Sequence, residues 1–266
     1  MNELVPASQW ILQKYFELEK KLDKHLKDYE IAHSIDALES FLWDDFANWY
    51  VEYLKTDQTQ IKFAKELYKQ FVITISPYMP FETQALWEGF FGEKTLLANY
   101  KKDLGWGREY VIEYVEEFEL IKSVVEKLRS LRGLFAIDPA TRITVYSGSQ
   151  LLQKYSQYLG FIAKCDVKKF NDGKLYEVKI NQANSFGIDI LSYVMDRVEE
   201  INKTNKEIAS LEKQIGGLEK KLSNLKFIEH ASVETVEESK ENLSQRKIEL
   251  ENQREKLEVL NDKNED

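Results

Sequence analysis

Apolar residues recur every seven positions over the last seventy residues of the chain. The first series comprises Ile201, Ile208, Ile215 and Leu222. A leucine follows each of the last three members by three residues, at Leu211, Leu218 and Leu225. After a break at residues 226–232 the period restarts at Val236, Leu243, Leu250 and Leu257. Seven-residue spacing aligns apolar side chains along one narrow helix face, so the pattern predicts an antiparallel two-helix hairpin. Helices of about 30 residues are about 45 Å long, so we expect the hairpin to project as an arm.

Residues 6–92 show the 3.6-residue period of packed helices instead. Helices are expected to run from Pro6, from about Tyr29 to Leu54, from about Gln60 to Ile75, and from Phe81. The apolar face of the second helix is expected to comprise Ile31, Ile35, Leu38, Leu42 and Trp49. Large aromatic side chains at helical spacing are usually core, which is the prediction for Trp43, Phe46, Trp49 and Trp87. Asp45 diverges from its neighbour Asp44 by about 100° and is interpreted as a buried or capping partner within the bundle.

The middle of the chain combines helices with strands. Apolar spacing predicts a long helix from Glu109 to Leu134 and a shorter helix at residues 150–159. Alternation predicts three strands, at residues 142–146, 167–170 and 175–180. The turn signal Asn171-Asp172-Gly173 predicts that the last two strands pair as a hairpin. The expected domains are a helical bundle (1–105), a long helix with a small α+β unit (106–191) and a coiled-coil arm (192–266).

Composition and charge limit the classes of function. The net charge of −9 argues against a sequence-independent nucleic-acid binder, and DNA is not an expected partner. From Asp196 to the end there are 13 basic and 18 acidic residues, so any RNA contact must come from local groups. No apolar run is long enough to span a bilayer and no signal peptide is recognisable, which predicts a cytoplasmic protein. The one cysteine, Cys165, is expected to be a small strand or turn residue without a disulfide or zinc role.

The break between the two heptad series carries a family resemblance. Residues 221–231 read K-L-S-N-L-K-F-I-E-H-A and residues 233–237 read V-E-T-V-E. This resembles the hairpin tip of the C-terminal arm of valyl-tRNA synthetases. The chain departs from that pattern at Ser232, where the family usually has proline, and at Thr235. Ser232 can still cap the second helix with its hydroxyl.

Three further segments resemble the same family. Residues 41–52, F-L-W-D-D-F-A-N-W-Y-V-E, are similar to a helix of its anticodon-binding domain, with departures at Ala47 and Asn48. Residues 76–87, S-P-Y-M-P-F-E-T-Q-A-L-W, look like a motif that class I synthetases for branched aliphatic amino acids share. Residues 128–132, L-R-S-L-R, with the later I-D-P, resemble the junction that follows.

The resemblance implies a mainly α fold. Its parts would be a helical bundle of the class I synthetase anticodon-binding type, a small α+β junction unit and a C-terminal antiparallel two-helix coiled coil. The implied partners are tRNA, in particular tRNA(Val), and the catalytic domains of the same enzyme. ATP would be the cofactor of the full enzyme. This chain lacks the H-I-G-H and K-M-S-K-S signatures and a P-loop, so no catalytic residue, cofactor or metal is expected in it, and no activity alone.

Six basic residues are the candidate tRNA contacts: Arg129, Arg132, Arg197, Lys220, Lys221 and Lys226. Lysine and arginine bind phosphates, which position an RNA without reading its sequence. The same residues also suit an ordinary solvated helix face, where long side chains extend over the surface. A second hypothesis therefore stays open, in which the chain is a free-standing interaction protein that self-associates through its coiled coil.

Overall fold

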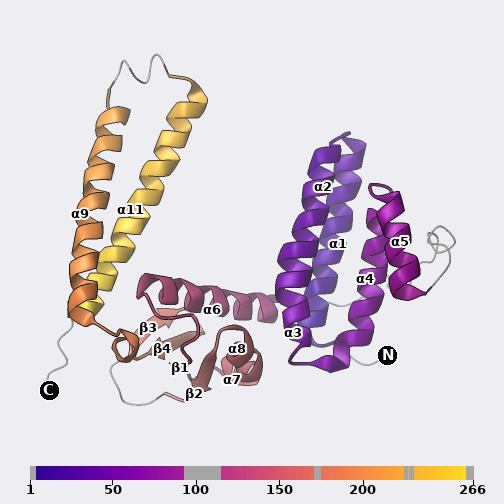
Figure 1. Ribbon diagram of the computed structural model, residues 1–266, viewed down its shortest axis with the longest axis horizontal. Coiled ribbons are helices and arrows are strands. Elements are labelled where there is room, and N and C mark those ends of the chain that lie inside the picture. Colours follow the sequence, from indigo (N-terminus) through magenta and orange to yellow (C-terminus); the bar gives the residue numbers. More distant parts are fainter. Residues whose placement is uncertain (1–3, 93–114, 171–174, 225–226, 228–230, 262–266) are drawn as a thin grey trace. The chain divides into compact units, whose positions relative to one another are not determined.

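The computed structural model describes residues 4–92, 115–170, 175–224, 227 and 231–261 (Figure 1). It divides into two compact units, residues 1–123 and 124–266. The described residues are mainly helical with a four-stranded sheet, which confirms the predicted fold class. None of the helices in this part of the chain has the length and apolar character that a bilayer crossing requires. The three-domain division stays a prediction, because the unit boundary falls inside helix α6 (Val115–Leu134).

The first unit is a bundle of helices packed on an aromatic core. Its elements are α1 (Pro6–Lys27), α2 (Ile31–Ser40), the π-helix η1 (Phe41–Val51), α3 (Glu52–Leu54), the 3-10 turn η2 (Gln58–Gln60), α4 (Ile61–Ile75) and α5 (Pro80–Phe91). Trp10 of α1 meets Phe118 of α6 with ring centroids 4.9 Å apart. The ring centroids of Phe41 and Phe71 of α4 are 5.3 Å apart. These contacts bury the large rings that hold α1, η1, α4 and the first half of α6 together.

The predicted apolar face of the second helix is partly wrong. Ile31 and Ile35 are half exposed, and Trp43, expected in the core, is 58% exposed. Leu38, Phe46 and Trp49 are buried as predicted, and the other buried side chains of this stretch are Ser34, Phe41, Tyr50 and Tyr53. The step from Phe41 to Phe46 spans five residues, because the π-helix places more residues in each turn than the α-helix. A 3.6-residue period therefore fails across η1, although it correctly places Trp49 and Trp87 in the core.

Asp45 is a half-buried partner within the bundle, and it makes an ion pair rather than a helix cap. Its carboxylate lies 3.9 Å from Lys122 Nζ of α6. Burial raises the pKa of Asp45, and the nearby Lys122 ammonium partly offsets this. The Lys122 ammonium also lies over the rings of Trp10 (4.5 Å) and Trp49 (5.1 Å), so one cation joins three elements of the bundle.

The second unit starts with the C-terminal half of α6 and continues into the sheet. Its elements are β1 (Ile143–Tyr146), α7 (Gln150–Lys154), α8 (Ser156–Ile162), β2 (Cys165–Lys168), β3 (Tyr176–Lys179), β4 (Ser185–Ile188) and the 3-10 turn η4 (Ile190–Tyr193). The strand order is β2-β1-β4-β3. β1 and β2 are parallel, with Ile143 opposite Cys165, and α7 and α8 form the crossover between them. Cys165 is buried, which raises the pKa of its thiol to about 12 and confirms the structural role predicted for it.

The predicted hairpin between the second and third strands is wrong. β2 and β3 lie at opposite edges of the sheet, and the turn signal at 171–173 lies outside the described residues. β3 pairs instead with β4, a strand that the sequence pattern did not predict. The turn between them is closed by Asn181, whose side-chain oxygen accepts the backbone N–H groups of Ala183 (3.0 Å) and Asn184 (2.8 Å).

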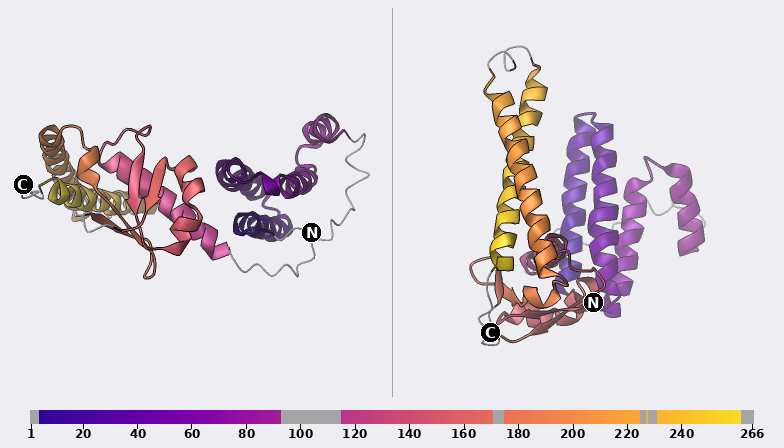
Figure 2. Two further views of the ribbon diagram at one scale, coloured as in Figure 1. Left: turned by 90° about the horizontal axis from the view of Figure 1, so that it is seen from below. Right: turned by 60° about the vertical axis from the view of Figure 1, so that its left-hand side comes forward.

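The arm consists of two antiparallel helices, α9 (Arg197–Leu222) and α11 (Val233–Asn261), which run side by side in both views of Figure 2. Leu211 and Ile215 are buried in the seam, as the heptads predicted. The seam becomes polar toward its base, where Thr204 is fully buried and Lys256 is 2% exposed. Lys256 Nζ lies 2.6 Å from Glu200 Oε1.

The adjacent glycines Gly216 and Gly217 are expected to make the arm weakest near its middle. A Cβ added at either position would meet no atom within 4 Å, so no close helix crossing requires a glycine there. Alanine at both positions should raise the free energy of unfolding by up to about 1 kcal/mol per site. Amide exchange across residues 211–222 should become slower.

Ser210→Ala on the same helix is the matched control and should give a smaller gain, since serine is a better helix former than glycine. Unchanged or lower stability of the double alanine variant would contradict this account of the glycines.

Candidate nucleic-acid interface

The outward face of α9 carries a row of lysines. With the buried Leu211 and Ile215 assigned to the heptad seam, the positions that point away from α11 are Lys203, Lys206, Ser210, Lys213, Gly217 and Lys220. All six are exposed, and no acidic residue interrupts them. We call Lys203, Lys206, Lys213 and Lys220 the lysine row. None of the four makes an ion pair within the described part of the chain.

The outward face of α11 has the opposite charge. Its corresponding positions are Glu238, Glu241, Gln245, Ile248, Asn252 and Glu255, all exposed and without a basic residue. A phosphate chain is therefore attracted to the α9 side of the arm and repelled from the α11 side. This asymmetry is how an arm with more acidic than basic residues can present a basic surface.

Ion pairs between the helices explain why the lysine row remains unpaired. Lys247 of α11 contacts Glu219 of α9 at 2.8 Å, and Arg254 contacts Glu212 at 2.7 Å. Together with the Lys256–Glu200 pair, these contacts occupy acidic groups of α9 that would otherwise compete for its lysines. The cations of α11 thus tie the hairpin together, while those on the outer face of α9 stay available to an external anion.

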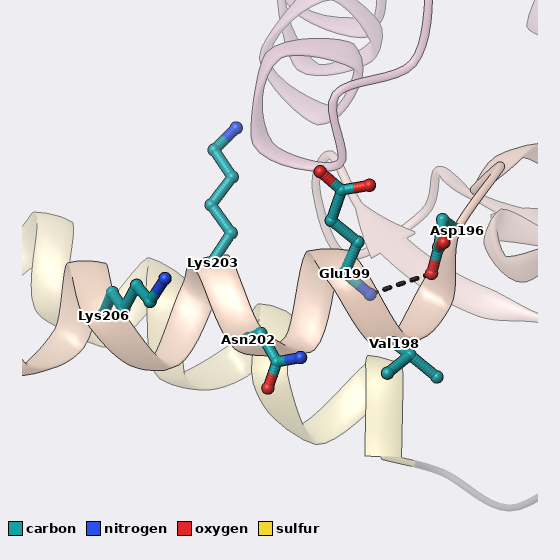
Figure 3. A pocket seen from close by; sticks show the side chains of 6 residues that line it. All are labelled: Asp196, Val198, Glu199, Asn202, Lys203 and Lys206. Atoms are coloured by element: carbon teal, nitrogen blue, oxygen red, sulfur yellow. Dashed lines mark hydrogen bonds between the residues drawn. The ribbon is translucent and has the colours of Figure 1, made fainter.

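The N-terminal end of the lysine row borders an open pocket at the start of α9 (Figure 3). The pocket is lined by Asp196, Val198, Glu199, Asn202, Lys203 and Lys206. Asp196 caps the helix by accepting the backbone N–H of Glu199 at 2.8 Å. The carboxylates of Asp196 and Glu199 make the end of α9 unfavourable for an anion, so the basic surface begins at Lys203.

The predicted arm contacts take different positions in the structure. Lys220 belongs to the lysine row. Lys221 lies beside it but is directed toward the arm itself, 3.3 Å from Ser239 Oγ and 4.6 Å from the centre of the Phe227 ring. Arg197 donates from Nε to the carbonyl of Leu260 and so closes the base of the hairpin. Lys226 lies outside the described residues.

Of the two predicted junction arginines, Arg129 is exposed on α6 and Arg132 is buried. The Arg132 guanidinium donates to four backbone carbonyls, those of Asp138 (3.2 Å), Thr141 (2.8 Å), Ala163 (3.0 Å) and Lys164 (3.1 Å). This geometry argues against the phosphate contact predicted for Arg132, because its donors already bind the protein's own carbonyls. Its role is to join α6 to the two chain segments that precede β1 and β2.

The lysine row also shows what the sequence reasoning missed. Lys203, Lys206 and Lys213 were not among the candidates, although their heptad positions are readable from the sequence. Assigning each basic residue to an inward, flanking or outward heptad position would have grouped all four lysines and set them apart from the cations of α11.

Comparisons with known proteins identify the class. A family model of the anticodon-binding domain of tRNA ligases matches residues 8–147, more than half of the chain. The chain belongs to this family. A second model, the valyl-tRNA synthetase tRNA-binding arm, matches residues 196–261 and hence both arm helices.

Curated relatives point to the same synthetase. The valine–tRNA ligase of Syntrophotalea carbinolica is 25% identical over 91% of this chain and 29% of its own length. That of Aquifex aeolicus is 26% identical over 98% of this chain and 24% of its own length. That of Mycolicibacterium paratuberculosis is 29% identical over 50% of this chain and 16% of its own length. The chain thus resembles the C-terminal part of valyl-tRNA synthetases and spans less than a third of the length of these relatives.

We expect Arg132→Met to lower the free energy of unfolding by at least about 2 kcal/mol, because it leaves one buried and three partly buried carbonyls without their charged donor. Arg129→Met, an exposed arginine three residues earlier on the same helix, is the matched control and should change stability much less. Chemical denaturation measures both. Unchanged stability of Arg132→Met combined with weaker tRNA binding would instead support a phosphate contact.

Proposed function

We propose that this chain is the tRNA-binding part of a valine–tRNA ligase and that it binds tRNA(Val). The helical bundle would engage the anticodon stem and loop, and the arm would support the outer corner of the tRNA. Both family models and the valine–tRNA ligases among the relatives support this proposal. Catalytic domains of the same enzyme, in the cytoplasm, would carry out the ATP-dependent aminoacylation. The chain's own contribution is binding energy and orientation of the acceptor end.

The lysine row is the observation that carries this proposal. Lys206, Lys213 and Lys220 stand one heptad apart, so their helix positions are separated by about 10.5 Å along α9. Each ammonium is a point charge on a flexible stem and can adjust to the spacing of an RNA backbone. The small residues Ser210 and Gly217 between them leave room for the backbone to approach. Such a surface provides affinity and position without base specificity.

The alternative, a free-standing protein that self-associates through its coiled coil, is not favoured by the comparisons, since both matched domains are those of tRNA ligases. The charge pattern disfavours one such contact in addition. Two copies that met through the outer faces of α9 would bring their lysine rows together, and like charges at close range repel.

We expect the isolated chain to show no valine-dependent exchange between ATP and pyrophosphate. The sequence contains neither of the class I signatures that bind ATP, so no residue is assigned to adenylate formation. The assay follows radiolabelled pyrophosphate into ATP, with a complete valine–tRNA ligase as the positive control. ATP–pyrophosphate exchange activity that co-purifies with the chain would contradict the proposal that catalysis belongs to other domains of the enzyme.

The lysine row itself is tested by Lys206→Ala, Lys213→Ala and Lys220→Ala combined in one variant. Alanine keeps the helix, so folding should be preserved. Binding to every tRNA that the chain accepts should weaken. The slope of log affinity against log salt should become shallower by about two to three, at about 0.7–0.9 for each phosphate that the variant no longer neutralises. Preference for valine tRNA should persist, because anticodon recognition is assigned to the bundle.

The matched control removes two positive charges from α11, as Lys240→Ala and Arg246→Ala, and is compared with the double variant Lys213→Ala and Lys220→Ala. The net charge change is identical, but these two side chains of α11 pair with Glu237 and Glu249 of their own helix, so the pairs between the helices stay intact. We expect this variant to keep its salt slope. Equal weakening of both variants would show that net charge acts rather than the α9 face. If the lysine-row variant loses a dimer in sedimentation but keeps its tRNA affinity, the self-association alternative is favoured.

A further inference from the structure

Two of the three histidines in the chain converge on one carboxylate at the turn between α1 and α2. His25 belongs to the last turn of α1, Glu30 precedes α2, and His33 lies in the first turn of α2. The Nδ1 atom of His25 is 2.7 Å from Glu30 Oε2, and that of His33 is 3.4 Å from the same oxygen. The two imidazole rings have centroids 5.5 Å apart. None of these residues belongs to the proposed tRNA surface of the arm.

The backbone of the turn holds this arrangement in place. The N–H of Glu30 donates to the carbonyl of His25 at 2.8 Å, which closes the end of α1. Tyr29 takes a left-handed conformation (φ 58°), which is unfavourable for a residue with a side chain. On the other side, the N–H of Ser34 donates to the carbonyl of Glu30 and starts α2. Glu30 is therefore fixed between the two histidines by main-chain bonds to both helices.

The donor set suits a transition-metal ion. Imidazole nitrogens and a carboxylate oxygen are ligands of Zn²⁺, at bond lengths of about 2.0–2.2 Å. A tetrahedral ion with such bonds needs ligand atoms about 3.3 Å apart. One ligand atom from each of His25, Glu30 and His33 lies within 4.8 Å of the other two, so small side-chain rotations would close the site. We propose that His25, Glu30 and His33 bind one divalent transition-metal ion, with Zn²⁺ the best chemical match.

The electrostatics of the cluster agree with this assignment. Hydrogen bonding to His25, and then to His33, lowers the pKa of Glu30 below its usual value, so the carboxylate is charged at neutral pH. The three side chains remain partly accessible, which leaves the fourth coordination position to water or another small ligand. A bound ion would replace the hydrogen bonds at Glu30 and link the end of α1 to the start of α2.

The test is titration of the full, untagged chain with ZnCl₂ by calorimetry, and with CoCl₂ by visible absorption, at neutral pH. We expect one equivalent of Zn²⁺ to bind, and Co²⁺ at the same site to show the ligand-field spectrum of a nitrogen and oxygen donor set. Zn²⁺ should also raise the melting temperature of the chain, since an ion that binds only the folded state stabilises it.

His33→Ala and His25→Ala should each weaken Zn²⁺ binding at least about tenfold, because even residues that only orient a metal ligand alter affinity 10–100-fold. Circular dichroism checks that both variants fold, and Glu30→Gln offers a third ligand change with little change in shape. His230→Ala, the remaining histidine, is the matched control and should bind like the parent chain. The proposal is overturned if no stoichiometric binding occurs, if the ligand variants titrate like the parent, or if His230→Ala removes the binding.

Discussion

A two-helix hairpin has only one buried seam, and this constraint governs the whole arm. Every side chain outside the seam and its flanks stays in water, so the outward faces of α9 and α11 are free to carry charge. Three acidic groups of α9 near the seam, Glu200, Glu212 and Glu219, are neutralised by cations of α11. What remains on the outside is a lysine row on one helix and a row with three carboxylates on the other. The arm is thus polarised across its width.

The polar base of the seam fixes how that charged face is oriented. Burying the Lys256–Glu200 pair costs desolvation, so it adds little net stability, but a shifted register would leave both charges buried and unpaired. Arg197 of α9, bonded to the carbonyl of Leu260, holds the same register. The hydroxyl of Tyr176 of β3 donates to Glu255 at 2.6 Å and so joins α11 to the sheet. The lysine row therefore has a defined orientation relative to the α+β unit within its own compact unit.

Patterns of local period were enough to predict much of the fold. The heptads of the arm, the helices of the bundle and the strand at 143–146 follow from side-chain spacing along the chain. Two features depended on interactions that spacing does not contain. The π-helix η1 changes the number of residues per turn, which brings Phe46, five residues after Phe41, onto the buried face. The pairing of β3 with β4 depends on the Asx turn at Asn181, while a stronger-looking turn signal lies between strands that do not pair.

In the candidate site, too, the residue type alone does not tell which contacts a side chain makes. Arg129 and Arg132 are identical in chemistry and nearly adjacent, yet Arg129 is exposed while Arg132 is buried and meets four carbonyls brought together from residues 138 to 164. No local pattern records that convergence. For the arm the position was readable, since a heptad assigns every residue to a face. The net charge adds up the charges of all faces of the arm, whereas an RNA contacts one face at a time. An acidic total is therefore compatible with phosphate binding when the cations are gathered on one helix and the carboxylates on the other.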